Sequence, residues 1–333
     1  MSVIQTVFSA ELPAREHLLI QKHRISTDPD GPRMAVVTGV HGDELEGQYI
    51  AYELGNILEN NLDKLHGTVD IYPAVNPLGI NSIERGVPMF DLDLNRTFPG
   101  DAEGDLTETL AAAVVDDIAG ACVAVDIHAS NIFLREMPQV RINELTSKTL
   151  VPLAPLLNVD YVWVHASATV LESTLAYSLN AKDTPTLVVE TGVGMRITEE
   201  YCHRLTQGLL RLAAHFGIWN GDFERGRTPI ISRDGKVNYL NAGHAGIFLP
   251  RAPHGTMVSE GQLVGIIADP LKGEIVEEIV APADGLLFTL REYPIVYPGS
   301  LLARILADVP VTYPEDADHD INDPKFSVLR GDI

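Results

Sequence analysis

The stretch MAVVTGVHGDELEG, residues 34–47, carries the strongest structural signal in the chain. Its first half is a continuous apolar run rich in valine, which is typical of a strand buried on both faces of a sheet. The chain then turns through Gly42, and apolar residues follow at helical spacing between Glu44 and Leu58. A strand, a tight turn and a helix in this order place the turn at the carboxyl edge of a sheet, where α/β proteins bind ligands.

Further elements surround this stretch. We expect buried strands at 68–75, 122–128 and 186–190 and helices at about 107–119, 145–157 and 198–216. Residues 17–25 and 34–40 are rich in β-forming residues and flank an Asp-Pro-Asp-Gly turn, which predicts a hairpin between them. Strands that alternate with helices indicate an α/β domain with a mostly parallel sheet and helices on both faces.

The chain has 333 residues, more than one hydrophobic core usually supports, so we expect two domains. After Trp219 the sequence becomes polar and rich in turn residues, and helical periodicity does not return. We therefore place a catalytic domain at 1–222. Short apolar runs broken by glycine and proline at 223–312 predict a smaller all-β domain, and 313–333 is an acidic tail.

The charge balance excludes several classes of partner. The chain has 24 lysines and arginines against 46 acidic residues, a net charge of -22, so we expect neither nucleic acid nor an anionic membrane as a partner. It shows no signal peptide and no apolar run of membrane-spanning length. Its two cysteines, Cys122 and Cys202, cannot form a disulfide framework, which suits a reducing compartment and predicts a cytoplasmic protein.

A metal site is predicted at the edge of the sheet. His41 and Glu44 are three residues apart in the turn, so an imidazole and a carboxylate converge on one ion. A catalytic zinc typically takes three protein ligands and keeps a fourth position for water. His128 ends the strand predicted at 122–128 and is the best third ligand. Asp126, on the same strand face, either orients an active-site group or is a buried structural carboxylate.

Other polar residues are expected around this ion. Glu190 ends a predicted strand, where its carboxylate could take a proton from water and return it to a leaving amine, or could simply stabilise a turn. In the turn-rich stretch that follows 68–75, Arg96 beside Asn95 could grip a substrate carboxylate, and Arg85 could stabilise an oxyanion. Taken alone, each arginine is more typical of a protein surface.

Five motifs together resemble one family. They occur in the order GVHGDELEG (39–47), NPLG (76–79), DLNRTFPG (93–100), DIH (126–128) and VVETG (188–192). The first 220 residues or so resemble the succinylglutamate desuccinylase/aspartoacylase group, which is related to the zinc carboxypeptidases. Within the group, the HGDE-x-EGQ motif and the two-part architecture look most similar to those of bacterial N-acetyl-diaminobutyrate deacetylases.

The resemblance implies a carboxypeptidase-like fold and a set of residue roles. The implied roles are His41, Glu44 and His128 as ligands of one zinc ion per chain, Glu190 as general base, Arg85 as the group polarising the scissile carbonyl, and Asn95 with Arg96 as carboxylate clamp. Aspartoacylases carry one more substrate-reading arginine upstream of the base, but 171–189 contains none. Arg135 or Arg141, soon after His128, could bind the substrate instead.

The second domain resembles a different fold. Residues 258–287 are similar to the barrel-sandwich fold of lipoyl and biotinyl carriers, with Lys272 in a hairpin, but the usual neighbours of a modified lysine are missing. We expect this domain to shape the mouth of the cleft or to form a homo-oligomer interface.

These observations predict a zinc-dependent amidohydrolase that removes the acyl group from a small N-acyl amino acid. Two alternatives stay open at this point. One is a metallocarboxypeptidase that acts on short peptides, because the same residues would cut beside a terminal carboxylate. The other is a non-catalytic module that binds a small molecule.

Overall fold

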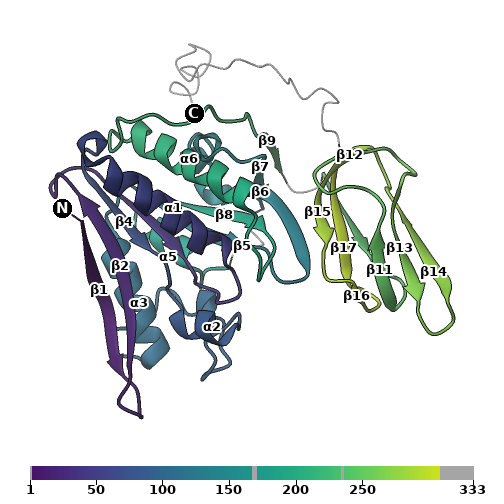
Figure 1. The fold of residues 1–333 in the computed structure, drawn as a ribbon, viewed down its shortest axis with the longest axis horizontal. Helices are drawn as coiled ribbons and strands as arrows, with labels where there is room; N and C mark the ends of the chain where they lie inside the picture. The colour runs from purple at the N-terminus through teal and green to yellow at the C-terminus, as the bar shows by residue number, and fades with distance from the viewer. Residues whose placement is uncertain (1, 167–170, 234–235, 308–333) are drawn as a thin grey trace.

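The strand at the start of the opening stretch lies in the middle of one large sheet (Figure 1). The structure is a computed structural model that describes residues 2–166, 171–233 and 236–307, so the expected tail at 313–333 lies outside the described residues. Strand β3 (Arg33–Thr38) runs parallel to β4 (Thr68–Tyr72) and β5 (Val123–Ala129), and β5 runs parallel to β8 (Thr186–Gly192). Nearly all side chains of these strands are buried, which explains their continuous apolar runs.

Antiparallel strands extend this parallel centre on both sides. Strand β2 (His17–Ser26) pairs with β1 (Ser2–Glu11) and β4, so β4 separates β2 from β3. The hairpin predicted between 17–25 and 34–40 is therefore wrong, because the turn between them joins two strands that are not neighbours. On the other side, β6 (Leu134–Asn143) is antiparallel to β8.

Two further parallel strands lie beyond β6. They are β7 (Tyr161–His165) and β9 (Ile230–Arg233), and β9 belongs to this sheet although it follows the domain boundary expected at 222. That boundary stays a prediction. The sheet as a whole is mixed, with its parallel strands at the centre.

Helices cover both faces of the sheet (Figure 1). Helices α1 (Glu46–Asn60) and α6 (Glu199–His215) pack together on one face, and α3 (Leu106–Ile118) and α5 (Leu175–Ala181) pack on the other. Three short helical segments lie between α1 and α3: η1 (Leu62–Lys64) before β4, and α2 (Pro77–Ser82) and η2 (Leu94–Arg96) after it. Among the described residues, no helix has both the length and the apolar composition needed to cross a lipid bilayer.

The helix predicted at 145–157 is wrong. The chain instead forms three short pieces, η3 (Glu144–Thr146), α4 (Ser147–Leu150) and η4 (Ala154–Leu157). Pro152 and Pro155 explain the interruption, because proline lacks the N–H group that a continuing helix needs and its ring clashes with the preceding turn.

Every described regular element after β9 is also a strand, as expected for the C-terminal part. Strand β15 (Gly285–Arg291) is antiparallel to β6 and thereby joins the large sheet. Strand β15 also pairs with β17 (Leu301–Ala307) and β12 (Met257–Val258), and β17 in turn pairs with β10 (Val237–Asn241). A second sheet has the order β14 (Glu274–Val280), β13 (Leu263–Asp269), β11 (Gly246–Pro250), β16 (Ile295–Val296).

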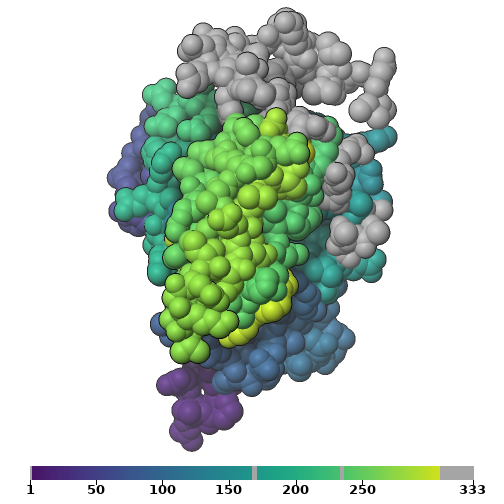
Figure 2. Space-filling model, turned by 90° about the vertical axis from the view of Figure 1, so that its right-hand side faces the viewer, coloured from purple at the N-terminus to yellow at the C-terminus, as the bar shows by residue number. Residues whose placement is uncertain are grey.

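The two groups of C-terminal strands share an apolar core that includes Phe248, Val264 and Leu302. Figure 2 shows these strands, in green to yellow, in front of the teal and blue surface of the preceding chain. The exposed Lys272 lies in the turn between β13 and β14, which confirms the predicted hairpin.

Candidate metal centre

The loop between β3 and α1 places the first two candidate ligands, and Gly42 allows its close packing. A Cβ atom on Gly42 would lie 2.0 Å from the carbonyl carbon of Gly79 and 2.4 Å from the carbonyl oxygen of Glu84. The Gly42 N–H also donates to the Arg85 carbonyl at 3.1 Å. The loop therefore lies directly against the backbone of the 79–85 segment, at a distance that only glycine permits.

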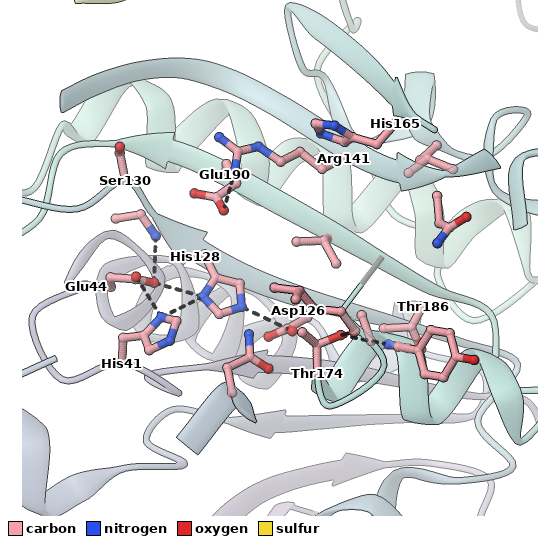
Figure 3. A pocket seen from close by; sticks show the side chains of 18 of the residues that line it. His41, Glu44, Asp126, His128, Ser130, Arg141, His165, Thr174, Thr186 and Glu190 are labelled. Atoms are coloured by element: carbon pink, nitrogen blue, oxygen red, sulfur yellow. Dashed lines mark hydrogen bonds and ion pairs between the residues drawn. The ribbon is translucent and has the colours of Figure 1, made fainter. Parts of the chain in front are cut away.

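Three donor atoms from His41, Glu44 and His128 converge at this edge of the sheet (Figure 3). His41 Nδ1 lies 2.7 Å from Glu44 Oε1, His128 Nδ1 lies 2.9 Å from Glu44 Oε2, and the two Nδ1 atoms are 3.2 Å apart. All three side chains are only 3–4% exposed. Ligands at about 2.0–2.1 Å from a tetrahedral zinc ion are separated by about 3.3 Å, so this cluster needs little adjustment to hold one ion.

Two carboxylates orient the imidazoles from outside the cluster. Asp93 Oδ1 lies 3.0 Å from His41 Nε2, and Asp126 Oδ2 lies 3.1 Å from His128 Nε2. If each imidazole carries its proton on Nε2, on the side of its carboxylate, both Nδ1 lone pairs face the shared point. Burial disfavours the charged form of Glu44, but the two imidazoles outweigh it and lower its pKa to about 2. The Nδ1 lone pairs of His41 and His128 and the carboxylate of Glu44 then face one point, and together they form a suitable binding site for a cation.

The geometry therefore agrees with the orienting alternative for Asp126, whereas the sequence reasoning missed Asp93. Asp93 stands in the DLNRTFPG motif, but the arginine and asparagine that follow it drew attention to substrate binding. It also accepts the N–H of Asn95 at the start of η2. The available signal was its position two residues before Asn95 in the same motif, although its partner His41 is 52 residues away in sequence.

Glu190 on β8 is the register partner of His128 on β5, so the candidate base stands directly beside the cluster. Burial raises the pKa of Glu190, and the nearby Arg141 opposes this rise. Arg141 Nη1 lies 3.2 Å from Glu190 Oε1, and its Nη2 donates to Glu136 Oε1 at 3.2 Å (Figure 3 labels Arg141 and Glu190). The candidate base Glu190 is thus held by a cation that is itself bound to a second, buried carboxylate.

The predicted substrate-binding and oxyanion-stabilising residues Arg85, Asn95 and Arg96 line a cavity of about 990 Å³. Arg85 Nη1 donates to Glu44 Oε1 at 2.9 Å. Asn95 is buried, and its Oδ1 accepts the N–H of Leu175 at 3.0 Å, whereas Arg96 is exposed. All three candidates line the cavity together with the His-Glu-His cluster.

Comparison with known proteins agrees with this geometry. The family model described as the succinylglutamate desuccinylase/aspartoacylase catalytic domain matches residues 30–216. The chain belongs to this family. The match contains all three residues of the cluster, and Glu190 as well.

Individual members of the succinylglutamate desuccinylase/aspartoacylase family are distant in sequence. The N-alpha-acetyl-L-2,4-diaminobutyric acid deacetylase of Halomonas elongata is 24% identical over 84% of this chain and 83% of its own. The Rhodobacter sphaeroides succinylglutamate desuccinylase/aspartoacylase is 24% identical with a TM-score of 0.77, covering 92% of this chain and 96% of its own. The product-bound ectoine utilization protein EutE (DoeB) from Ruegeria pomeroyi is 21% identical with a TM-score of 0.78, covering 92% and 94%. The fold of the family thus extends over the C-terminal strands.

The two arginines proposed in place of the missing family arginine have different surroundings. Arg141 lines the cavity. Arg135 is not among the described lining residues: it alternates on β6 with Leu134 and Glu136, which line the cavity, and its Nε and Nη2 both bind the carboxylate of Glu292, each at 3.1 Å. The structure therefore brings Arg141 to the site and leaves Arg135 outside the cavity.

Proposed function

We propose that this chain is a zinc-dependent deacylase that hydrolyses the amide bond of an N-acyl amino acid. The observation that carries the proposal is the convergence of His41, Glu44 and His128, with each imidazole backed by its own carboxylate, beside Glu190. Family membership supports it, and so does the Halomonas elongata relative, whose name is that of an N-acetyl amino acid deacetylase.

The proposal assigns one zinc ion to His41, Glu44 and His128, where it would polarise the amide carbonyl and lower the pKa of water. The remaining steps belong to side chains of the protein. Glu190 receives a proton from the attacking water and delivers it to the amine nitrogen as the C–N bond breaks. The new C–O bond and the broken C–N bond leave a carboxylic acid and a free amino acid.

Positive charge around the cavity supports the same reaction. Arg85 stands beside the ligand carboxylate of Glu44, where it can stabilise the oxyanion that forms on the carbonyl oxygen. Asn95 uses its oxygen to accept the Leu175 N–H, which leaves its NH2 group as the donor for a substrate carboxylate. Arg96, next to it, supplies the charge for that carboxylate.

The test compares wild type with Glu190→Gln, and with Glu103→Gln as a surface control. We expect about one zinc per chain in all three, and release of amino acid from N-acetyl or N-succinyl amino acids by wild type and the control. Glu190→Gln should lose about 10²-fold or more in rate while it keeps its zinc. An undiminished rate in zinc-loaded Glu190→Gln would remove Glu190 from the proposal.

The same assays separate the two alternatives. Cleavage of dipeptides without cleavage of N-acyl amino acids would identify a carboxypeptidase. A protein that takes up no zinc and hydrolyses neither class would be a binding module.

A further inference from the structure

Charged and uncharged residues line different parts of the cavity. On β8, Glu190, Val188 and Thr186 line the cavity along one side of the strand and alternate with residues that point away from it. The strand therefore leads from the metal cluster at Glu190 inward to Thr186, about 13 Å at 3.3 Å per residue. Figure 3 shows the same direction, with the cluster at one end and Thr186 at the other.

The sheet register places the charges at the outer end. His128 pairs with Glu190, and Asp126 and Arg141 both pair with Val188, one step further in. Beyond this row, the cavity is lined by residues that include Leu145, Leu150, Ala176, Tyr177, Thr186 and His165, and we call this part the inner half. Leu145 is 70% exposed, so the inner half is partly open to solvent. Among the described residues, no aspartate, glutamate, lysine or arginine lines the inner half, and His165 is a titratable lining side chain of this part.

Three polar side chains of the inner half, Thr186, Thr146 and Asn180, already have partners in the protein. The Thr186 hydroxyl donates to the Thr184 carbonyl at 2.8 Å, and the Thr146 hydroxyl donates to the Asn143 carbonyl at 3.2 Å. The Asn180 side chain donates to the Thr186 carbonyl at 3.0 Å. A ligand group that enters this region therefore meets few free hydrogen-bonding groups, and an apolar group loses least on leaving water.

Asn95 contacts the start of the helix that lines the inner half. Its Oδ1 accepts the N–H of Leu175, the first residue of α5, and the next residues of the same helix, Ala176 and Tyr177, line the inner half. A carboxylate held at Asn95 and Arg96 thus lies next to the inner half.

Resting on the deacylase activity proposed above, we infer that the amino acid released by this protein carries a large, uncharged and mainly apolar side chain, which occupies the inner half. This distinguishes the chain from its Halomonas elongata relative, which is named for a substrate with an amino group on its side chain.

The test is a substrate panel for the zinc-loaded full chain. N-acetyl derivatives of methionine, leucine and phenylalanine should be hydrolysed with kcat/KM at least tenfold above those of aspartate, glutamate and 2,4-diaminobutyrate. Equal or higher values for a charged side chain would overturn the inference while leaving the deacylase activity in place. Failure to hydrolyse any member of the panel would overturn both.

A second experiment varies the acyl group on methionine from acetyl to butanoyl and hexanoyl. We expect kcat/KM to rise less than threefold, because the inner half receives the side chain of the amino acid and not the acyl group. A gain of tenfold or more with acyl length would assign the inner half to the acyl group and contradict the inference.

Two variants place a cation on the part of α5 that lines the cavity. Tyr177→Arg and Ala181→Arg lie one helical turn apart on α5, and Ala181 is exposed, so at least the second should fold normally. Each should raise the ratio of N-acetyl-aspartate to N-acetyl-methionine hydrolysis at least tenfold, whereas Tyr177→Phe should keep the wild-type order. If both arginine variants melt like wild type and leave the ratio unchanged, the side chain does not bind there.

Discussion

Arg304 Nη1 lies 2.6 Å from Glu136 Oε1, and this ion pair joins a C-terminal strand to the strand beside the candidate base. Glu136 is 1% exposed, and its Oε2 also accepts the Thr289 hydroxyl at 2.8 Å. The same carboxylate binds Arg141, which binds Glu190. The C-terminal strands therefore take part in the electrostatics of the site.

Arg304→Met should destabilise the protein. It removes one of the cations that compensate the buried charge of Glu136, and breaking a buried ion pair costs about 3 kcal/mol. Urea unfolding would measure the loss, and Arg251→Met, at an exposed position, should change the free energy of unfolding by about 0.5 kcal/mol at most. Equal effects of the two variants would show that the ion pair contributes nothing.

Arg141→Met should shift the pH dependence of hydrolysis. Burial raises the pKa of Glu190, and Arg141, 3.2 Å away, favours the ionised form and limits the rise. Without Arg141 the pKa rises further, so the base becomes protonated at a higher pH and the acidic limb of the kcat profile moves upward. Arg135→Met, whose guanidinium binds Glu292 outside the cavity, should leave the limb in place. A shift toward lower pH would contradict the assignment.

Removal of metal should abolish hydrolysis, and zinc should restore it. Zinc should also stabilise the folded protein, by about 2.7 kcal/mol at a free concentration of one hundred times Kd, which thermal melting would detect. His128→Ala should lose this stabilisation, and His244→Ala, whose exposed ring lies 3.2 Å from Glu277, should keep it. Full activity after exhaustive chelation would rule out the metal.

Asp93→Asn should weaken zinc binding. The Asp93 carboxylate, 3.0 Å from His41 Nε2, fixes which ring nitrogen is protonated. Loss of such a partner typically lowers the affinity for the metal by about 10–100-fold, so we expect a loss of at least about tenfold. A competition titration with a zinc indicator would measure the change. Asp91→Asn, exposed and two residues earlier, is the matched control. Identical affinities for both variants would contradict the role of Asp93.

Gly42→Ala should disrupt the ligand loop. Its Cβ would lie 2.0 Å from the Gly79 backbone, so the loop must move and His41 moves with it. We expect a lower melting temperature together with weaker zinc binding. In Gly55→Ala, within α1, the nearest atom is 3.4 Å from the new Cβ, so this variant should be neutral or more stable by up to about 1 kcal/mol. A zinc affinity unchanged in Gly42→Ala would show that the loop adapts.

The amino-acid sequence by itself determined the local elements that deliver the candidate ligands. The valine-rich run before Gly42 predicts the buried strand, and apolar periodicity predicts the helices at 107–119 and 198–216, which the structure contains as α3 and α6. Five motifs in order were enough to indicate the family, which the comparison confirms. These signals are local, because they depend on backbone preference and on which side of an element is apolar.

Only the tertiary structure decided which elements are neighbours. The pairing of β2 with β4 instead of β3, and the contacts from Asp93 to His41 and from Arg304 to Glu136, join residues up to 168 positions apart. Whether Arg141 or Arg135 reaches the cavity likewise depends on the register of β6 against β8 and β15. Such contacts are set by strand order and register, which arise from the packing of the whole core and are not encoded in any short stretch of sequence.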